Sequence, residues 1–308
     1  EQQRPLDAPA RWLQQAIRRL YAAGPLARRV ENGLHGTWLG HPLHPVLTDF
    51  PIGAWTLALV FDTLNASGPG RAFRRCADTA VGLGALSGLA TIAAGYTDWQ
   101  YTSERPRRLG LVHSALNVGI TLSQIAAFVL RVTGRRSTGV ALSTASYGIL
   151  VASAYLGSQM IGEHRIGVDH TAGQTPPADY VPLLPVADLA ENQARRVMAG
   201  SFPVLLVRQR GQIYALPATC THLGGPLDQG RLDEGGITCP WHGSHFALDN
   251  GRVLGGPASF PERCLSTRIR DGQIEVGPGP SLGHCEHAQA EAPVGKAERE
   301  REPAAAMP

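Results

Sequence analysis

Hydrophobic and polar positions divide the chain into a first half with four long apolar runs and a second half with short ones. Each long run could cross ~30 Å of hydrocarbon as a helix, and short Arg-containing loops separate the runs. Small residues such as Gly84 and Gly88 would let helix backbones approach closely in lipid. The pattern predicts a four-helix transmembrane bundle over residues 36–170, against the alternative of buried helices in a soluble bundle. The runs are 46–64, 79–96, 109–130 and 139–162.

The segment 1–35 precedes the first run and is amphipathic. Its apolar residues lie on one helical face, whereas Arg11, Arg18 and Arg19 lie elsewhere, which is typical of a helix in the membrane interface. It is too polar, and too far from any small-residue cleavage site, to be a signal peptide, so no export signal is expected. The apolar face is made of Trp12, Leu13, Ala16, Ile17, Leu20 and Tyr21.

After the fourth run, the Pro-rich residues 171–181 read as a linker, and short β-type runs follow over residues 178–277. Turn formers at 210–211, 250–251 and 271–272 predict hairpins. The fold class is therefore a multi-domain one, with an all-α four-helix transmembrane bundle followed by a small all-β domain. Beyond Gly277, few large apolar residues are available for burial, so residues 278–308 are predicted to be a disordered tail.

Composition changes this picture in two ways. The net charge of +3 comes almost wholly from scattered Arg without interleaved aromatic residues, which argues against nucleic acid as a partner. The five Cys include three isolated ones, Cys76, Cys264 and Cys285, and do not form the dense pattern of a secreted disulfide scaffold. A reducing compartment is therefore expected.

The other two Cys stand in the stretches "CTHLGGPL", from Cys220, and "CPWHGSHF", from Cys239. Each stretch offers one Cys and one His on a loop of the β domain. Two Cys and two His suit tetrahedral zinc, but zinc fingers usually pair Cys with Cys and His with His. One thiolate and one imidazole from each loop suit a binuclear cluster in which one iron takes both sulfurs and the other both nitrogens.

With these motifs and the later "GGPA", residues 178–277 resemble the Rieske 2Fe-2S family. The resemblance implies one 2Fe-2S cluster, with Cys220 and Cys239 ligating one iron and His222 and His242 the other. It also implies that Ser244 donates a hydrogen bond to a bridging sulfide.

Departures from the high-potential Rieske subtypes lie in the same two loops. Gly225 and Trp241 replace the two Cys of an extra disulfide, and Phe246 replaces a Tyr whose hydroxyl points at a Cys sulfur. The domain therefore resembles the ferredoxin type. Hydrogen bonds to sulfur stabilise the reduced cluster, so we expect a potential in the lower part of the Rieske range of roughly −150 to +300 mV.

The membrane half gathers its His residues at the face from which the β domain emerges. Its stretches "LGHPLHPVLTDFPIGAW", "LGLVHSALN" and "GEHRIGVDH" resemble an uncharacterised bacterial family of four-helix membrane domains with a His-Pro-x-His-Pro motif. His113 and Asn117, one turn apart, are predicted to point into the bundle. These His are either interfacial residues bonded to headgroups and carbonyls, or a site for haem b, a quinone or non-haem iron. The candidates are His41, His44, His113, His164 and His170.

Together these features predict a membrane-anchored Rieske ferredoxin that transfers one electron at a time between a soluble redox partner and a membrane redox site. Such a protein would be an electron-transfer component of an oxidoreductase system, and no catalytic residue is assigned. The alternatives are a Rieske-fed membrane oxidase or oxygenase, a quinol oxidoreductase with a His-rich metal or haem site, and an iron-sulfur redox sensor.

Location follows from the same reasoning. Four spans imply a multi-pass protein of the bacterial cell membrane, in contact with lipid. Arg residues near the spans favour neither side, but a basic interfacial helix suits an anionic inner leaflet. A domain that carries a cluster should also fold where clusters are assembled. We therefore expect a cytoplasmic Rieske domain.

Overall fold

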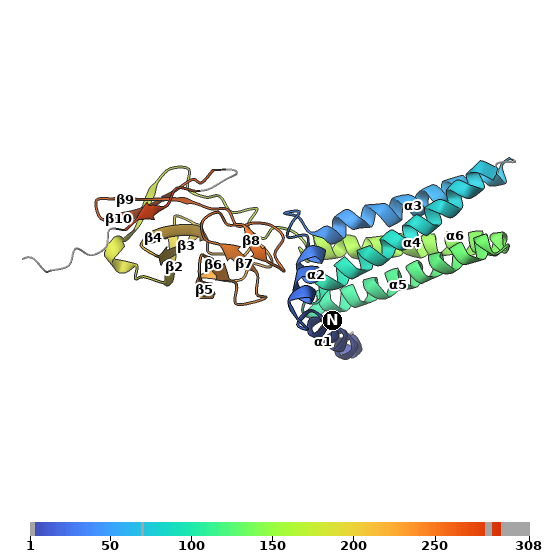
Figure 1. Ribbon diagram of the computed structural model, residues 1–308, viewed down its shortest axis with the longest axis horizontal. Helices are drawn as coiled ribbons and strands as arrows, with labels where there is room; N and C mark the ends of the chain where they lie inside the picture. The colour runs from blue at the N-terminus through green and yellow to red at the C-terminus, as the bar shows by residue number, and fades with distance from the viewer. Residues whose placement is uncertain (1–3, 69–70, 281–284, 291–308) are drawn as a thin grey trace, which may run out of the picture.

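The computed structural model describes residues 4–68, 71–280 and 285–290. A helical body and a β body lie end to end along the long axis of the molecule (Figure 1). The first short helices, at the blue end of the chain, lie beside the end of the long helices that is nearest to the β body (Figure 1).

The helical body is built on four long helices, each long and apolar enough to cross a membrane. At most of their ends, these helices extend beyond the predicted apolar runs. The predicted four-helix bundle is confirmed. Packing is extensive between α3 and α4, α4 and α5, and α5 and α6, but slight between α3 and α6. The bundle therefore has one weak seam. The helices are α3 (Leu43–Ala66), α4 (Arg71–Trp99), α5 (Glu104–Val132) and α6 (Arg136–Gly162).

One charged residue from each long helix meets at the end of the bundle far from the β body. The buried guanidinium of Arg131 forms ion pairs with Asp62 and Asp78, and Arg136 forms ion pairs with both of these carboxylates. A charge in an apolar bundle is costly unless it is paired and hydrogen-bonded, as these four are. This cluster ties the four helix ends together and gives Arg131 and Arg136 a structural role.

Two helices, α1 (Asp7–Tyr21) and α2 (Pro25–His35), occupy the segment for which one interfacial helix was predicted, and the short η1 (Arg4–Leu6) precedes them. Gly24 separates the helices, and Pro25 begins α2, where its missing N–H costs nothing. The buried side chain of Gln14 donates to the carbonyl oxygens of Trp99 and Thr102, which lie at and just beyond the end of α4. Trp12 and Leu20 stay exposed. The polar side of α1 thus docks on the bundle, and part of its apolar face is left for lipid.

The described residues of the β body form three antiparallel sheets, in the strand orders β1-β10-β9, β11-β4-β3-β2 and β5-β6-β7-β8. Arg210 and Gly211, and likewise Asp271 and Gly272, have positive φ in the predicted hairpin turns. The β body also contains the short helices η2 (Val186–Asp188) and η3 (Leu227–Gln229). The strands are β1 (Val181–Pro185), β2 (Gln193–Ala199), β3 (Phe202–Gln209), β4 (Gln212–Pro217), β5 (Arg231–Asp233), β6 (Gly236–Thr238), β7 (His245–Ala247), β8 (Val253–Gly255), β9 (Ser266–Arg270), β10 (Gln273–Gly277) and β11 (Ala288–Gln289).

The predicted disorder after Gly277 is wrong for residues 285–290. Cys285 forms a disulfide with Cys264, and β11 pairs with β4. The ring of His287 bonds the carbonyl oxygen of Asp249. A disulfide and a two-residue strand anchor this segment without the large apolar side chains on which the prediction relied, so composition did not reveal them. The rest of the predicted tail includes residues 281–284 and 291–308, which lie outside the described residues.

Candidate metal centre and membrane cavity

The two predicted ligand loops share the same backbone turn. The first loop begins at Cys220, after β4, and the second at Cys239, after β6. The N–H groups of Gly224 and Gly243 donate to the carbonyl oxygens of Cys220 and Cys239, at 2.9 and 3.1 Å. Both glycines have positive φ, which a side chain would strain. Two matching turns therefore present one Cys and one His each.

The sulfurs of Cys220 and Cys239 lie together in the buried interior between the loops. Both thiols are free and almost inaccessible, and they are hydrogen-bonded to each other. Backbone N–H groups also point at them, from His222 to the Cys220 sulfur and from Trp241 and His242 to the Cys239 sulfur. The bond from Cys220 lowers the pKa of Cys239 to about 7, while the same bond and burial raise the pKa of Cys220. The backbone N–H groups that point at the two sulfurs would stabilise negative charge on them.

The two imidazoles lie beside each other at the tip of the domain. The ring centroids of His222 and His242 are 5.1 Å apart, with the planes nearly perpendicular. Burial lowers the pKa of both rings, which keeps them in the neutral form that ligates metal. The Nδ1 atom of His222 is buried and has no hydrogen-bond partner among the described residues. Such an orphaned acceptor fits a metal ligand.

Side chains around the loops leave little freedom for the ligands. A Cβ on Gly225 would lie 2.8 Å from the Cys239 sulfur, so only glycine fits there. The hydroxyl of Ser244, fully buried, accepts the N–H of Ala258 at 3.0 Å and keeps its own proton for another acceptor. Beneath the first loop, the carboxyl of Glu262 accepts the N–H of Thr221 at 2.7 Å, and burial raises its pKa. Sequence reasoning missed Glu262 because Glu is rarely fully buried.

The donor set fits a two-iron cluster better than a single metal ion. The four predicted ligands form one sulfur pair and one imidazole pair, and a 2Fe-2S cluster with mixed ligation needs two of each.

Phe246 supplies no hydroxyl to this centre. It is fully buried in the same hydrophobic cluster as Cys220 and Cys239. Replacing Phe246 by Tyr is expected to raise the midpoint potential by tens of millivolts, because one added hydrogen bond to sulfur, about 1 kcal/mol, is worth ~40 mV for a one-electron couple. A redox titration followed by visible absorption checks this. The matched control is Phe73→Tyr in α4, far from the cluster, which should leave the potential unchanged. An unchanged potential in the Phe246→Tyr variant would contradict the expectation.

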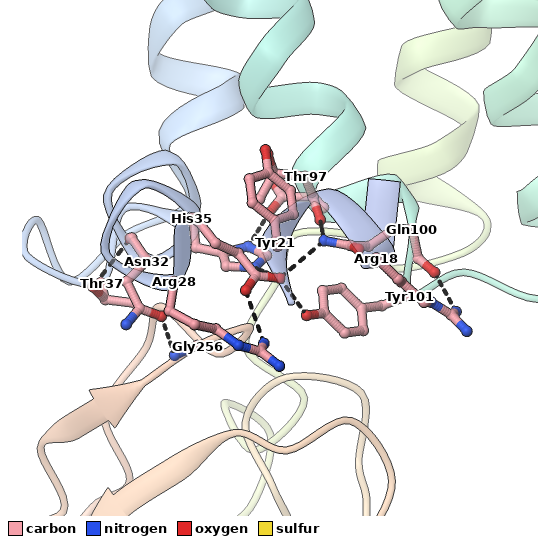
Figure 2. A network of polar contacts seen from close by, with 12 residues as sticks. Arg18, Tyr21, Arg28, Asn32, His35, Thr37, Thr97, Gln100, Tyr101 and Gly256 are labelled. Atoms are coloured by element: carbon pink, nitrogen blue, oxygen red, sulfur yellow. Dashed lines mark hydrogen bonds and ion pairs between the residues drawn. The ribbon is translucent and has the colours of Figure 1, made fainter. Parts of the chain in front are cut away.

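The tip that carries the imidazoles lies against the helical body. The ring of Tyr101, between α4 and α5, makes edge contacts with His222 and His242, both at 5.8 Å between centroids. The Tyr101 hydroxyl donates to Glu31 at 2.8 Å, and the Gln100 amide donates to the same carboxylate oxygen at 3.1 Å. Figure 2 shows Tyr101, Gln100 and residues of α1 and α2 together above the loops of the β body. Burial and the bond to Glu31 raise the pKa of Tyr101.

Other contacts fasten the two bodies around this tip. The N–H of Gly256 donates to the Asn32 side chain at 2.9 Å (Figure 2), and the N–H of His170 donates to the Thr221 carbonyl at 3.0 Å. The rings of His41 and Phe260 meet edge to face at 5.3 Å. Sequence reasoning missed Tyr101, Glu31 and Asn32, because nothing in their local sequence indicates a docking surface.

The structure separates the five predicted His of the membrane face. His41 and His170 lie at the junction with the β body, as above, and His164 lies just after α6 with its Nε2 buried and without a partner in the described chain. His44 and His113 instead line one cavity inside the bundle, together with Asn117. His113 and Asn117 point inward as predicted, since the Asn117 amide reaches Ser153 on α6 at 2.9 Å. One five-His site is not formed.

That cavity has a volume of about 340 Å³ and lies in the half of the bundle nearest the β body. All four long helices contribute to its wall. Most of the wall is apolar, with Trp55 and Trp99 among the large side chains and Asp98 at the junction side. A mostly apolar cavity with a few placed polar groups is typical of a small-molecule site.

Comparisons with known proteins match each half of the chain to a protein family. The family described as "Predicted membrane protein (DUF2231)" matches residues 40–170, and the "Rieske [2Fe-2S] domain" matches residues 179–267. The second half is 30% identical over 98 residues to Ferredoxin CarAc of Metapseudomonas resinovorans, which covers 32% of this chain and 92% of that protein.

Two further relatives are similar only in part. Apoptosis-inducing factor 3 of Homo sapiens is 36% identical over 114 residues, 37% of this chain, and the match spans only 19% of the human protein. A solved complex of reduced oxygenase and oxidized ferredoxin in carbazole 1,9a-dioxygenase contains a chain that is 28% identical, with a TM-score of 0.32, covering 34% of this chain and 97% of its own.

Proposed function

Because this chain belongs to the Rieske [2Fe-2S] family, we propose that Cys220 and Cys239 hold one iron of its cluster and that His222 and His242 hold the other. A Rieske cluster accepts and gives up one electron at a time. The paired sulfurs, their backbone N–H donors and the unpartnered Nδ1 of His222 support this assignment. Ser244, whose hydroxyl keeps its proton, would then offer a hydrogen-bond donor to the cluster.

The protein's proposed role is electron transfer between a soluble redox partner and a site in its own membrane half. One observation carries this proposal: both imidazoles of the cluster tip lie against Tyr101 of the helical body. The tip of the electron carrier is thereby directed at the bundle, at the end where the His-lined cavity lies. An anchor that served only for attachment would not need to receive the tip.

A soluble partner is supported by the relatives and by one exposed side chain. Several relatives are named ferredoxin components or subunits of dioxygenase systems, and this chain covers 94% and 87% of two of them. Trp241 stands next to His242 and is 57% exposed. Exposed aromatic side chains are enriched at protein interfaces, so Trp241 marks the surface beside the tip where a partner can approach.

The sidedness proposed here differs from the one that the sequence favours. Four helices that are long and apolar enough to span a membrane support a location of the β domain beside a bacterial cell membrane, and the basic first helices favour the cytoplasm. The Cys264–Cys285 disulfide favours an oxidising compartment, because disulfides rarely persist in a reducing cytoplasm. We give the disulfide more weight, because the Arg residues are balanced between the two faces. Cys264 and Cys285 should be oxidised in membranes isolated under thiol-blocking conditions, and finding both as free thiols would support the cytoplasmic side.

Electron exchange within one molecule tests the function. Full-length protein is placed in nanodiscs of lipid extracted from its source membranes, and the cluster is reduced with one equivalent of a soluble one-electron donor. We expect re-oxidation at a rate that does not change on tenfold dilution, because the tether keeps both halves together. Tyr101→Ala should slow the exchange, whereas Tyr155→Ala, an exposed tyrosine of α6, should not.

A rate proportional to protein concentration would show that the cluster exchanges electrons between molecules, and this would contradict the proposal. Absence of any re-oxidation would leave the bundle as an anchor only.

A further inference from the structure

The cavity of the helical bundle lies behind its weakest seam. Helices α3 and α6 pack slightly on each other, and both contribute to the cavity wall. At the end of the cavity that is far from the β body the seam is closed, because the Thr56 hydroxyl of α3 and the Tyr147 hydroxyl of α6 lie 2.8 Å apart and Trp55 packs with Leu150. The half of the seam nearest the β body is the part that borders the cavity. A ligand dissolved in the hydrocarbon would have its shortest route to the cavity there.

Both imidazoles of the cavity are fixed in one tautomer. The Nδ1 atom of His44 lies 2.9 Å from the Thr91 carbonyl oxygen, and Nδ1 of His113 lies 2.9 Å from the Ser153 carbonyl oxygen. A carbonyl oxygen only accepts, so each Nδ1 carries the proton and each Nε2 keeps a lone pair. The cavity therefore contains two nitrogen acceptors.

Two glycines allow these rings to pack closely against neighbouring helices. A Cβ on Gly95 of α4 would lie 2.8 Å from the His44 ring, and a Cβ on Gly157 of α6 would lie 3.1 Å from the His113 ring. The rings thus occupy space that any other residue would fill. Such close support restricts how an imidazole can turn, which is the property expected of a binding group.

Within the described residues, a hydrogen-bond partner reaches only one of the two Nε2 acceptors, and an incoming donor can replace that partner. The Asn117 amide nitrogen lies 3.1 Å from His113 Nε2, but also 2.8 Å from the His113 carbonyl oxygen and 2.9 Å from the Ser153 hydroxyl. An amide has two hydrogens, so it can keep two of these bonds and release Nε2. An incoming hydroxyl can then donate to His113.

The ligand that matches this site is soluble in lipid and carries hydroxyl donors on a flat, mostly apolar body. We propose that the cavity binds a quinol, with its hydroxyls donating to Nε2 of His44 and of His113. This inference rests on the proposed function and deepens it, because it names the class of the membrane redox partner.

Polar contacts connect the cavity with the cluster tip. Asp98, in the cavity wall, is bonded to Nδ1 of the fully buried His35 at 2.7 Å. His35 lies 3.9 Å from Glu31, which accepts the hydroxyl of Tyr101, and the Tyr101 ring contacts both cluster imidazoles. The proposed quinol site and the proposed cluster site are therefore joined by four consecutive side chains, and a carrier bound in the cavity is next to the electron pathway.

The protons and electrons of quinol oxidation can all be accounted for at this site. Oxidation of a quinol to a quinone releases two hydroxyl protons and two electrons. The Nε2 atoms of His44 and His113 can take one proton each, and the electrons leave one at a time toward the soluble acceptor of the proposed function. In the reverse direction, the same two nitrogens return the protons to a quinone as it is reduced.

Equilibrium binding tests the inference without any redox turnover. Full-length protein in nanodiscs of synthetic lipid is titrated anaerobically with a decyl-substituted benzoquinol, and the quenching of tryptophan fluorescence is followed, since Trp55 and Trp99 line the cavity. The dimethyl ether of the same quinol has no hydroxyl donor and should bind at least tenfold more weakly. His44→Ala and His113→Ala should each weaken quinol binding at least tenfold. His41→Ala, outside the cavity, is the matched control and should bind as the wild type does.

His113→Gln keeps an acceptor and should retain part of the affinity, so the test remains decisive if the alanine variant fails to fold. Equal binding of the quinol and its dimethyl ether would overturn the inference, as would unchanged binding in both alanine variants. A haem absorption band in the purified protein would also overturn it, because haem would occupy the same imidazoles. Quinol binding without electron exchange would contradict the proposed function alone, and exchange without quinol binding would contradict this inference alone.

Discussion

Replacing Cys220 by Ala is expected to remove both irons and both sulfides from the protein. The Cys220 sulfur is buried with that of Cys239 and is held by a backbone N–H from the His222 loop. Without it, one iron would keep a single protein ligand, and no other thiol among the described residues lies near enough to replace it. We expect no visible charge-transfer absorption, and less than about one tenth of the wild-type iron by metal analysis.

Cys76→Ala provides the matched control, because Cys76 is a free, exposed thiol near the start of α4, far from the β body. This variant should keep the full content of iron and sulfide. If Cys220→Ala kept both irons and an unchanged spectrum, the assignment of the sulfur pair as ligands would be wrong. Loss of the cluster in both variants would indicate general instability.

Replacing Cys285 by Ala is expected to lower the free energy of unfolding of the β domain by about 3 kcal/mol. The disulfide closes a loop of 21 residues between Cys264 and Cys285, and a cross-link of that span restricts the unfolded chain by roughly this amount. It also holds β11 beside β4. The measurement is chemical denaturation followed by the absorption of the cluster, and Cys76→Ala again serves as control.

The Cys285→Ala variant also distinguishes an effect of the disulfide on stability from an effect on the cluster. The spectrum and potential of the cluster at low denaturant should remain those of the wild type, because neither Cys264 nor Cys285 is a proposed ligand. Addition of a reductant for disulfides should destabilise the wild type to the level of the variant and leave the variant unchanged. Equal stability of both proteins, in the absence of reductant, would show that the cross-link does not form.

Sequence patterns predicted what depends on local spacing. The four spans follow from the length of apolar runs, and the two loops with Cys220 and Cys239 follow from the order of Cys and His along the chain. The hairpin turn at Arg210 and Gly211 follows from turn chemistry and is confirmed by positive φ at both positions. In each case the residues that determine the feature are neighbours in the sequence.

Features that depend on distant residues were missed or misjudged. The disulfide joins two Cys that looked isolated, and residues 285–290 have too little apolar surface to reveal that they pack. Docking of the cluster tip on Tyr101 requires two domains to meet, which no local pattern encodes. The His residues that were predicted at one membrane face do not form one site, because His44 and His113 lie on helices and line the cavity, whereas His41 precedes α3 and contacts Phe260 at the junction.

Electron paramagnetic resonance of the reduced full-length protein, with iron and sulfide counted on the same sample, tests the central claim most directly. Our account predicts two irons and two sulfides per chain, and a spectrum with the low average g value that is expected when nitrogen ligands replace sulfur on one iron. One zinc ion and no sulfide, or the spectrum of a cluster with four sulfur ligands, would contradict it.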